Sequence, residues 1–236
     1  MLNREKLMEE GHLIIDSNQF MPQLNELEPI INKEVWVDNP DLQKDTEYSY
    51  QRGYLMLSSK VVSAIPEDNY FPADYVDNHK KLSLISYKYF KDYINICQSI
   101  VNSEYFSSLN HDSYKIYELD IWKGTGGLDW HWDGSKFESH QANFFVMIYF
   151  TNEIFWEENQ GGVIEFGRVL DSINIEDVND PHKAPHFYSR TKIVPTNSIP
   201  PNNKTMLIAT NTDPNWVHRV SPQKSDKARI ALYFTF

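Results

Sequence analysis

The pattern of apolar positions changes near residue 113. Before that point, apolar residues recur three and four positions apart, which is the spacing of one buried helix face. This spacing predicts a helix around Leu24, Leu27 and Ile31, and we expect Pro29 to disturb this helix or end it early. A second, longer helix is predicted over residues 84–101. Its apolar stripe consists of Phe90, Tyr93, Ile94, Cys97, Ile100 and Val101.

Shorter apolar runs in the first half predict strands. Residues 12–15 form one such run, and the Asp-Ser-Asn that follows is typical of a helix start. A further strand is predicted over 54–57. Residues 1–11 are charged and are expected to be frayed or loosely helical, whereas 38–53 and 64–80 have the composition of loops.

The second half shows the patterns of strands. Residues 114–122 alternate and are rich in aromatic side chains, whereas 144–150 form a continuous apolar run bounded by polar residues. A run of that kind is typical of a buried strand. Further strands are predicted over 161–166, 205–209 and 228–236.

Residues 167–203 lack a clear pattern and contain several prolines. So long a stretch without structure inside a domain is usually functional or disordered, and we expect a lid or substrate loop. A zinc pair of His182 and His186 is an alternative, although no third ligand is evident. A lid or substrate role that includes His186 and Arg190 is favoured, because loops on rigid frameworks carry binding residues.

The order of these elements predicts one domain over residues 1–236. Residues 1–112 are expected to be mainly helical support, and residues 113–236 to form the core that carries the site. Helices first, strands second and no strand–helix alternation indicate a mostly β protein with flanking helices, of the α+β class. The predicted architecture is a jelly-roll barrel, or double-stranded β-helix, with the N-terminal helices packed on one face.

Composition narrows the classes of function. The chain has 236 residues, 41% of them hydrophobic, and a formal net charge of −11. The acidic balance argues against a nucleic-acid partner, which needs a basic face. The single cysteine, Cys97, excludes an internal disulfide and suits a reducing compartment. Without an apolar run long enough to span a membrane, we expect no membrane partner and a cytoplasmic protein. The residues point to no particular oligomeric state.

The candidate chemistry centres on Leu128-Asp-Trp-His-Trp-Asp-Gly134. In an extended segment, side chains alternate faces, so His131 and Asp133 point the same way. An imidazole and a carboxylate side by side need one more histidine to form a two-histidine, one-carboxylate face. That face leaves metal positions open and is used for non-heme Fe(II) and O2. His218 is the candidate for the third ligand.

Arg229 is the second unusual residue, because it opens an otherwise apolar strand. A charged residue in such a run is seldom buried without a partner. Period-2 alternation places Arg229 and Tyr233 on one face, and the strand contains no acid. A dicarboxylate ligand would supply a carboxylate that accepts two parallel hydrogen bonds from the guanidinium of Arg229. The alternative is a structural ion pair between Arg229 and an acidic residue elsewhere in the chain.

These residues occur in an order that resembles a known family. Residues 114–236 are similar to the Fe(II)- and 2-oxoglutarate-dependent oxygenases, and most of all to their prolyl-hydroxylase-like branch. The pieces that carry the resemblance are His131-Trp-Asp133, Ile148-Tyr-Phe-Thr-Asn152, Gly161-Gly-Val-Ile-Glu-Phe166, His218 with Val220 and Pro222, and Arg229. The first 110 residues carry no motif of that family.

The resemblance implies a role for each matching position. His131, Asp133 and His218 would bind Fe(II), and Arg229 would hold the distal carboxylate of 2-oxoglutarate. Trp122 stands where related enzymes often place a tyrosine that contacts this cosubstrate, and Phe150 where some carry a second tyrosine. Both departures remove a hydroxyl donor, which Tyr233 or Tyr117 is expected to supply. An aspartate at position 133 disfavours halogenation, because related halogenases carry glycine or alanine there.

The activity implied is O2-dependent oxidation of a substrate C–H bond, coupled to conversion of 2-oxoglutarate into succinate and CO2. The favoured substrate is a small molecule such as an amino acid or a natural-product intermediate, contacted by Trp132, His186 and Arg190. One alternative is a peptide or protein side chain, as for prolyl hydroxylases. Another is a non-oxidative metal-binding jelly-roll protein, either an isomerase or a sugar-binding module. The isolated histidines, among them His12, are expected to be structural.

Overall fold

The structure is a computed structural model. It describes residues 1–33, 92–109, 118–124, 127–133, 142–171, 191–225 and 229–236, and the single residues 116, 188 and 227. Several predictions lie outside the described residues. They are the strand over 54–57, the loops over 38–53 and 64–80, and the beginning of the helix over 84–101.

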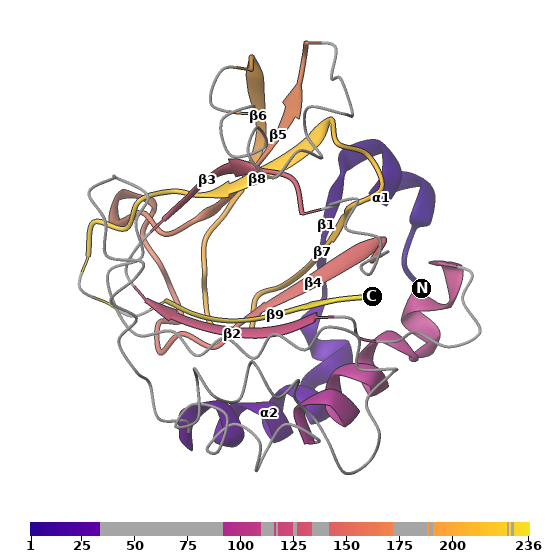
Figure 1. Cartoon of the computed structure of the whole chain (residues 1–236). Coiled ribbons are helices and arrows are strands. Elements are labelled where there is room, and N and C mark those ends of the chain that lie inside the picture. Colours follow the sequence, from indigo (N-terminus) through magenta and orange to yellow (C-terminus); the bar gives the residue numbers. More distant parts are fainter. Residues whose placement is uncertain are drawn as a thin grey trace, which may run out of the picture.

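Two antiparallel sheets form the centre of the molecule (Figure 1). The first sheet contains β1 (His12–Ile15), β2 (Glu118–Gly124), β4 (Phe144–Tyr149), β7 (Met206–Thr210) and β9 (Arg229–Thr235). The second contains β3 (Leu128–His131), β5 (Ile164–Val169), β6 (Ile193–Ile199) and β8 (Trp216–Val220). The strand orders are β1-β7-β4-β9-β2 and β3-β8-β5-β6.

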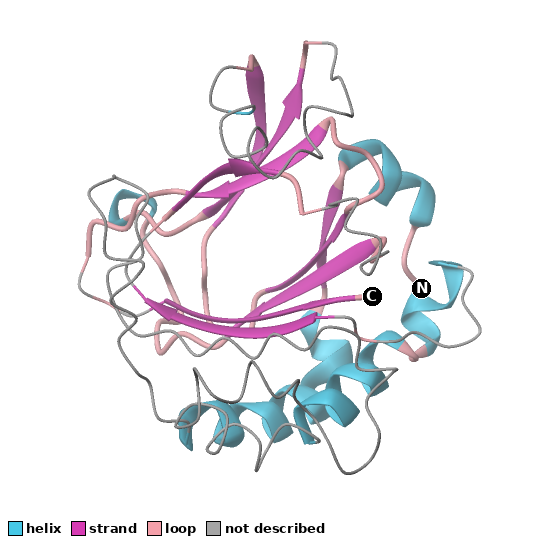
Figure 2. Cartoon of the chain, in the orientation of Figure 1, coloured by secondary structure: helices cyan, strands magenta, loops and turns pink. Residues whose placement is uncertain are grey.

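The helices lie mainly outside the five-stranded sheet (Figure 2). They are α1 (Arg4–Glu10), α2 (Met21–Lys33), a helical segment over 92–101, and the short 3-10 turns η1 (Ser17–Phe20), η4 (Glu104–Leu109) and η5 (Glu158–Gln160). The prediction of a mostly β protein with flanking helices is therefore confirmed. None of the helices in the described part of the chain combines the length and apolar character that a bilayer crossing requires.

The strands β4, β7 and β9 of the five-stranded sheet are buried on both faces, which explains the unbroken apolar run of β4. Val146 and Ile148 pack with the helices, in a core cluster that also contains Leu24 and Cys97. Phe145, Met147 and Tyr149 point the other way, toward the four-stranded sheet. A strand covered on both sides loses the alternation of polar and apolar residues and reads as continuously apolar.

Helix α2 corrects one expectation about proline. The helix continues through Pro29 and ends at Lys33. A proline inside a helix removes one backbone hydrogen bond and crowds the preceding turn. Here Leu24, Leu27 and Ile31 are fully buried on the same helix face. The burial of this stripe outweighs the local cost, because most helix stability in proteins comes from packing.

The irregular segment expected over 167–203 is also shorter than predicted. Residues 167–169 complete β5, and residues 193–199 form β6, which pairs with β5. β6 was not recognised because it contains Pro195 and is largely exposed. It lies at the edge of its sheet, where a strand tolerates proline and polar residues. The stretches 172–187 and 189–190 lie outside the described residues, so the lid stays a prediction.

The N-terminal segment contributes to the sheets as well as supporting them. β1 pairs with β7 along the edge of the five-stranded sheet, as His12↔Ala209 to Ile15↔Met206. His12 is buried and stacks on Phe166 of the other sheet, with ring centroids 3.9 Å apart. Its Nε2 accepts a hydrogen bond from the Asn197 amide at 2.8 Å. His12 is therefore a structural histidine that joins the two sheets, as expected.

Candidate metal centre

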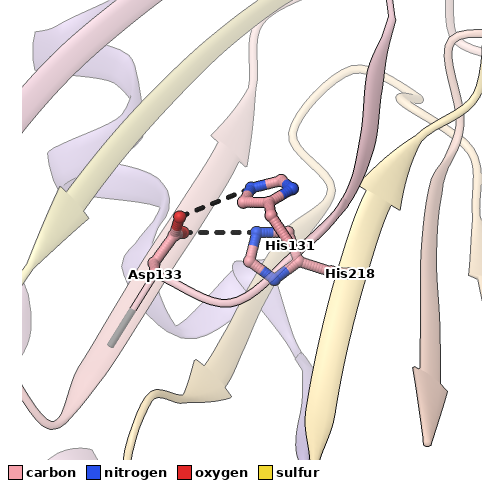
Figure 3. Close-up of side chains that lie close together, drawn as sticks. All are labelled: His131, Asp133 and His218. Atoms are coloured by element: carbon pink, nitrogen blue, oxygen red, sulfur yellow. Dashed lines mark ion pairs between the residues drawn. The ribbon is translucent and has the colours of Figure 1, made fainter. Parts of the chain in front are cut away.

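Three side chains predicted as ligands converge between the two sheets (Figure 3). The Nε2 atom of His131 lies 3.4 Å from Asp133 Oδ1, and that of His218 lies 3.2 Å from Asp133 Oδ2. One potential ligand atom from each residue lies within 4.8 Å of the other two. Donor atoms at 2.0–2.2 Å from a first-row metal stand at about these separations from one another. The three residues therefore fit one metal ion.

Strand pairing brings the two histidines together. His131 ends β3, His218 lies in β8, and the two are direct partners in the sheet register. Directly opposed residues of antiparallel strands present their side chains on the same face. Their rings meet edge to face at 4.2 Å. Asp133 follows two residues after His131, just beyond the end of β3, and supplies the carboxylate.

The residues around His131 fix its ring. Its Nδ1 donates to the carbonyl oxygen of Asp129 at 2.7 Å, which leaves the Nε2 lone pair directed toward Asp133. A backbone acceptor of this kind sets the tautomer that a metal requires.

The neighbouring Trp130 lies over the backbone of Gly167, where any Cβ would come within 3.0 Å of the indole. On the other side, the Arg219 guanidinium lies 4.7 Å from the Trp130 ring centroid.

Asp133 is ionised by its surroundings. Burial would raise the pKa of the Asp133 carboxyl, but the two imidazoles hold that pKa well below its usual range. Burial lowers the pKa of His218, and the nearby His131 lowers it further. Burial also acts to lower the pKa of His131, but the charge and hydrogen bond of Asp133 outweigh it and raise that pKa. The site thus favours a carboxylate and a neutral His218, which are ligand forms.

Residues of the five-stranded sheet contact the triad from the side opposite β3 and β8. The Tyr233 hydroxyl, on β9, donates to Asp133 Oδ2 at 2.8 Å. The Phe145 ring lies 4.9 Å from the ring of His218 and 5.2 Å from that of Tyr233. Apolar and aromatic walls around a metal position exclude water and lower the local dielectric.

Arg229 is buried and, within the described part of the chain, forms no ion pair with a carboxylate. It is 6% exposed. One of its terminal nitrogens lies 3.4 Å from the Tyr149 hydroxyl and 3.8 Å from the Met147 sulfur, and its Nε has no hydrogen-bond partner. A buried guanidinium without an acid is costly for a fold. The alternative of a structural ion pair therefore gains no support from these residues.

The arginine and the metal residues lie close along one surface. Met147, which the guanidinium contacts, is the direct strand partner of Tyr233, which contacts Asp133. The Nε of Arg229, which has no acceptor among the described residues, could therefore donate to an anionic group on this side of the sheet. Sequence reasoning missed Tyr149 as a companion of Arg229, because it sits inside a run that is apolar throughout.

Of the remaining predicted site residues, Trp132 and Phe150 point away from the metal position, and the side chains of the others lie outside the described residues. Trp132 is half-buried, and its indole N–H donates to the Asn211 carbonyl at 3.1 Å, within a small apolar cluster on the outer side of β8. Trp122 lies in β2 opposite Ala231, and its side chain is outside the described part, as are Tyr117, His182, His186 and Arg190. Phe150 packs with the helices and faces away from the metal position.

Comparisons with known proteins identify the fold. No model of a known protein family matches the chain, and neither does any curated protein sequence. Among solved structures, an oxidoreductase of the 2OG-Fe(II) oxygenase family from Burkholderia pseudomallei matches with a TM-score of 0.51 at 13% identity. The match covers 98% of this chain and 86% of that one. The chain therefore has the fold of a 2OG-Fe(II) oxygenase.

Two prolyl hydroxylases are more distant matches. One, from Trichoplax adhaerens, was solved with a hypoxia inducible factor peptide fragment, and matches at 14% identity with a TM-score of 0.45 over 98% of this chain and 86% of that chain. The other, a prolyl-4-hydroxylase from Pseudomonas putida, matches at 11% identity with a TM-score of 0.40 over 98% and 95% of the two chains.

Proposed function

We propose that this protein is an Fe(II)- and 2-oxoglutarate-dependent oxygenase built on a jelly-roll fold, and that it hydroxylates a C–H bond of a small molecule. The observation that carries the proposal is the occurrence of two features between the same two sheets. One is the His131–Asp133–His218 triad, and the other is the buried Arg229, which pairs with no acid among the described residues. A metal site by itself gives no reason for a buried guanidinium that has no acidic partner among the described residues.

Each residue has a distinct task in this proposal. His131, Asp133 and His218 would hold Fe(II), which when bound supplies the oxidative chemistry with O2 and 2-oxoglutarate. Arg229 and the Tyr149 hydroxyl would hold the distal carboxylate of the cosubstrate: the guanidinium donates to the Tyr149 oxygen at 3.4 Å, and this leaves the phenol hydrogen available for an acceptor beside Arg229. Phe145 and Tyr233 would keep water away from the metal position.

The small-molecule substrate is supported by a second arginine. Arg168 is the strand partner of Trp216, and the preceding pair on the same face is Phe166 with the metal residue His218. The Arg168 guanidinium lies 5.3 Å from the Trp216 ring centroid and is exposed. Within the described residues it has no acidic partner. A cation on this face beside the metal suits a substrate that carries a carboxylate, such as an amino acid.

The test is release of succinate by the purified protein supplied with Fe(II), 2-oxoglutarate and single compounds from a panel of free amino acids. Turnover should depend on both iron and cosubstrate, and Asp133→Ala should abolish it. Asp129→Asn is the matched control, because it keeps the oxygen that accepts the Trp130 backbone N–H and leaves the triad intact.

Three outcomes separate the alternatives. Parent-level succinate release by Asp133→Ala would overturn the proposed metal site. Turnover with proline-containing peptides but with no free amino acid would instead favour a peptide hydroxylase. Tight retention of zinc or calcium without any binding of 2-oxoglutarate would favour a non-oxidative metal protein.

A further inference from the structure

The carboxylate of Asp133 has three neighbours, and they come from both sheets. Oδ1 faces His131, whereas Oδ2 faces His218 at 3.2 Å and receives the Tyr233 hydroxyl at 2.8 Å. The histidines belong to the four-stranded sheet, but Tyr233 belongs to β9 of the five-stranded sheet. The phenol–carboxylate hydrogen bond therefore ties the Asp133 carboxylate, which follows β3 of the four-stranded sheet, to β9 of the five-stranded sheet.

We propose that Tyr233 is a positioning residue for the metal: its hydroxyl orients the Asp133 carboxylate and engages Oδ2, so that Oδ1 is the oxygen presented to the ion. This inference rests on the proposed metal site. An oxygen that accepts a short hydrogen bond from a phenol shares its electron density with that donor and is a weaker metal ligand than an oxygen without such a bond. Binding through one oxygen leaves more coordination positions open than binding through two.

The same hydrogen bond argues against the role that the sequence predicts for this tyrosine. A phenol has a single hydrogen, and an ionised carboxylate can only accept. Once that hydrogen is directed at Asp133, the oxygen offers only lone pairs to the cosubstrate carboxylate, which would repel them. The hydroxyl available to the cosubstrate is that of Tyr149, which lies beside Arg229.

Strand β9 carries both Arg229 and Tyr233 and therefore sets the spacing between them. Arg229 and Tyr233 are four residues apart and lie on one face, about 13 Å apart along the strand at ~3.3 Å per residue. The guanidinium extends back toward Met147, the strand partner of Tyr233. A single rigid strand thus carries both the anchor for the cosubstrate and the group that holds the metal carboxylate.

Tyr233→Phe tests the inference with Tyr149→Phe as the matched control. Both changes remove one hydroxyl from the inner face of the same sheet and keep the ring, so the packing against Phe145 is retained. Titration calorimetry with Mn²⁺ alone should show roughly 10- to 100-fold weaker metal binding for Tyr233→Phe, the range typical of lost partners of metal ligands. Tyr149→Phe should bind Mn²⁺ like the parent and 2-oxoglutarate more weakly.

A second readout reports the geometry of the site directly. The visible absorption of bound Co²⁺ depends on the number and arrangement of its ligands, and it should change in Tyr233→Phe but not in Tyr149→Phe. Circular dichroism and thermal unfolding establish that both variants are folded. A merely structural tyrosine would alter stability and leave both metal readouts unchanged.

The outcomes distinguish this inference from the proposed function. A parent protein that binds Mn²⁺, with a Tyr233→Phe affinity within twofold of it and an unchanged Co²⁺ spectrum, would overturn the inference and leave the oxygenase proposal standing. Equal loss of metal binding in both tyrosine variants would also overturn it. A parent protein that binds neither ion would remove the metal site itself, and the oxygenase proposal with it.

Discussion

Replacing Arg229 by methionine should separate function from stability, because the two effects have opposite signs. In the free protein the guanidinium is 6% exposed, has no acidic partner among the described residues, and leaves Nε without a hydrogen bond. Methionine fills a similar volume beside Met147 without a buried charge. Exchanging buried charged groups for apolar ones is often neutral or stabilising by about 1–4 kcal/mol. We therefore expect Arg229→Met to unfold at the same temperature as the parent or at a higher one.

The response to 2-oxoglutarate should change in the other direction. At a cosubstrate concentration of about 100 times Kd, the parent loaded with Mn²⁺ should gain about 2.7 kcal/mol. That gain corresponds to a rise in Tm of roughly 5–11 °C for a chain of this size. Loss of one partner of a buried charge pair costs about 2–5 kcal/mol of binding, or at least 30-fold in Kd. The gain in the variant should then fall below about 1 kcal/mol.

Thermal unfolding with and without 2-oxoglutarate measures both effects, and Arg219→Met provides the control. Arg219 is a half-buried arginine whose Nε donates to Glu165 at 2.6 Å. Its removal leaves that carboxylate unpaired and should cost roughly 1–3 kcal/mol of stability, while the cosubstrate response stays at the parent level. If Arg229→Met loses stability as Arg219→Met does and still responds fully to 2-oxoglutarate, the assignment of Arg229 is wrong.

Two further predictions concern pH and the substrate. Burial lowers the pKa of His12 from 6.5. As the pH falls, this histidine is therefore protonated in the unfolded chain before it is protonated in the folded one. The free energy of unfolding then decreases below about pH 6.5, by at most ~1.4 kcal/mol per pH unit. Denaturant unfolding at pH 7.5 and 5.5 should therefore show a stability advantage of the parent over His12→Phe that shrinks at the lower pH; a constant advantage would contradict the neutral state of this ring. Arg168→Ala should raise the KM of a carboxylate substrate roughly 10- to 150-fold, the value of a charge-assisted hydrogen bond, with Arg168→Lys intermediate. Succinate formation without that substrate should stay unchanged, and a KM equal to that of the parent would remove Arg168 from substrate binding.

The sequence by itself determined most of the chemistry of the site. His131 and Asp133 share a face because side chains alternate along an extended segment, and that rule needs no tertiary information. Arg229 could be recognised because a charge in an apolar strand demands an explanation. The helix stripe that contains Cys97 was likewise readable, since its period depends only on helix geometry.

The tertiary structure alone decided which side chains meet between the two sheets. The run 144–150 is apolar throughout, so its composition does not reveal which residues face the metal. The register with β9 settles the matter: Tyr149 lies opposite Ala231 and points inward, whereas Phe150 packs against the helices. A shift of one residue would exchange every inward and outward side chain.

Strands β6 and β8 escaped prediction for a related reason. In β8, His218 faces the other sheet, whereas Arg219 pairs with Glu165 on the outer side. Polar residues therefore occupy both faces of this strand. The partner of Tyr233 also lay beyond the reach of any local pattern, because Asp133 is 100 residues away in the sequence and follows a strand of the opposite sheet. Periodicity encodes the face on which a side chain lies within its own strand. The atom that it touches depends on the pairing of distant strands, and that pairing is set by the packing of the whole core.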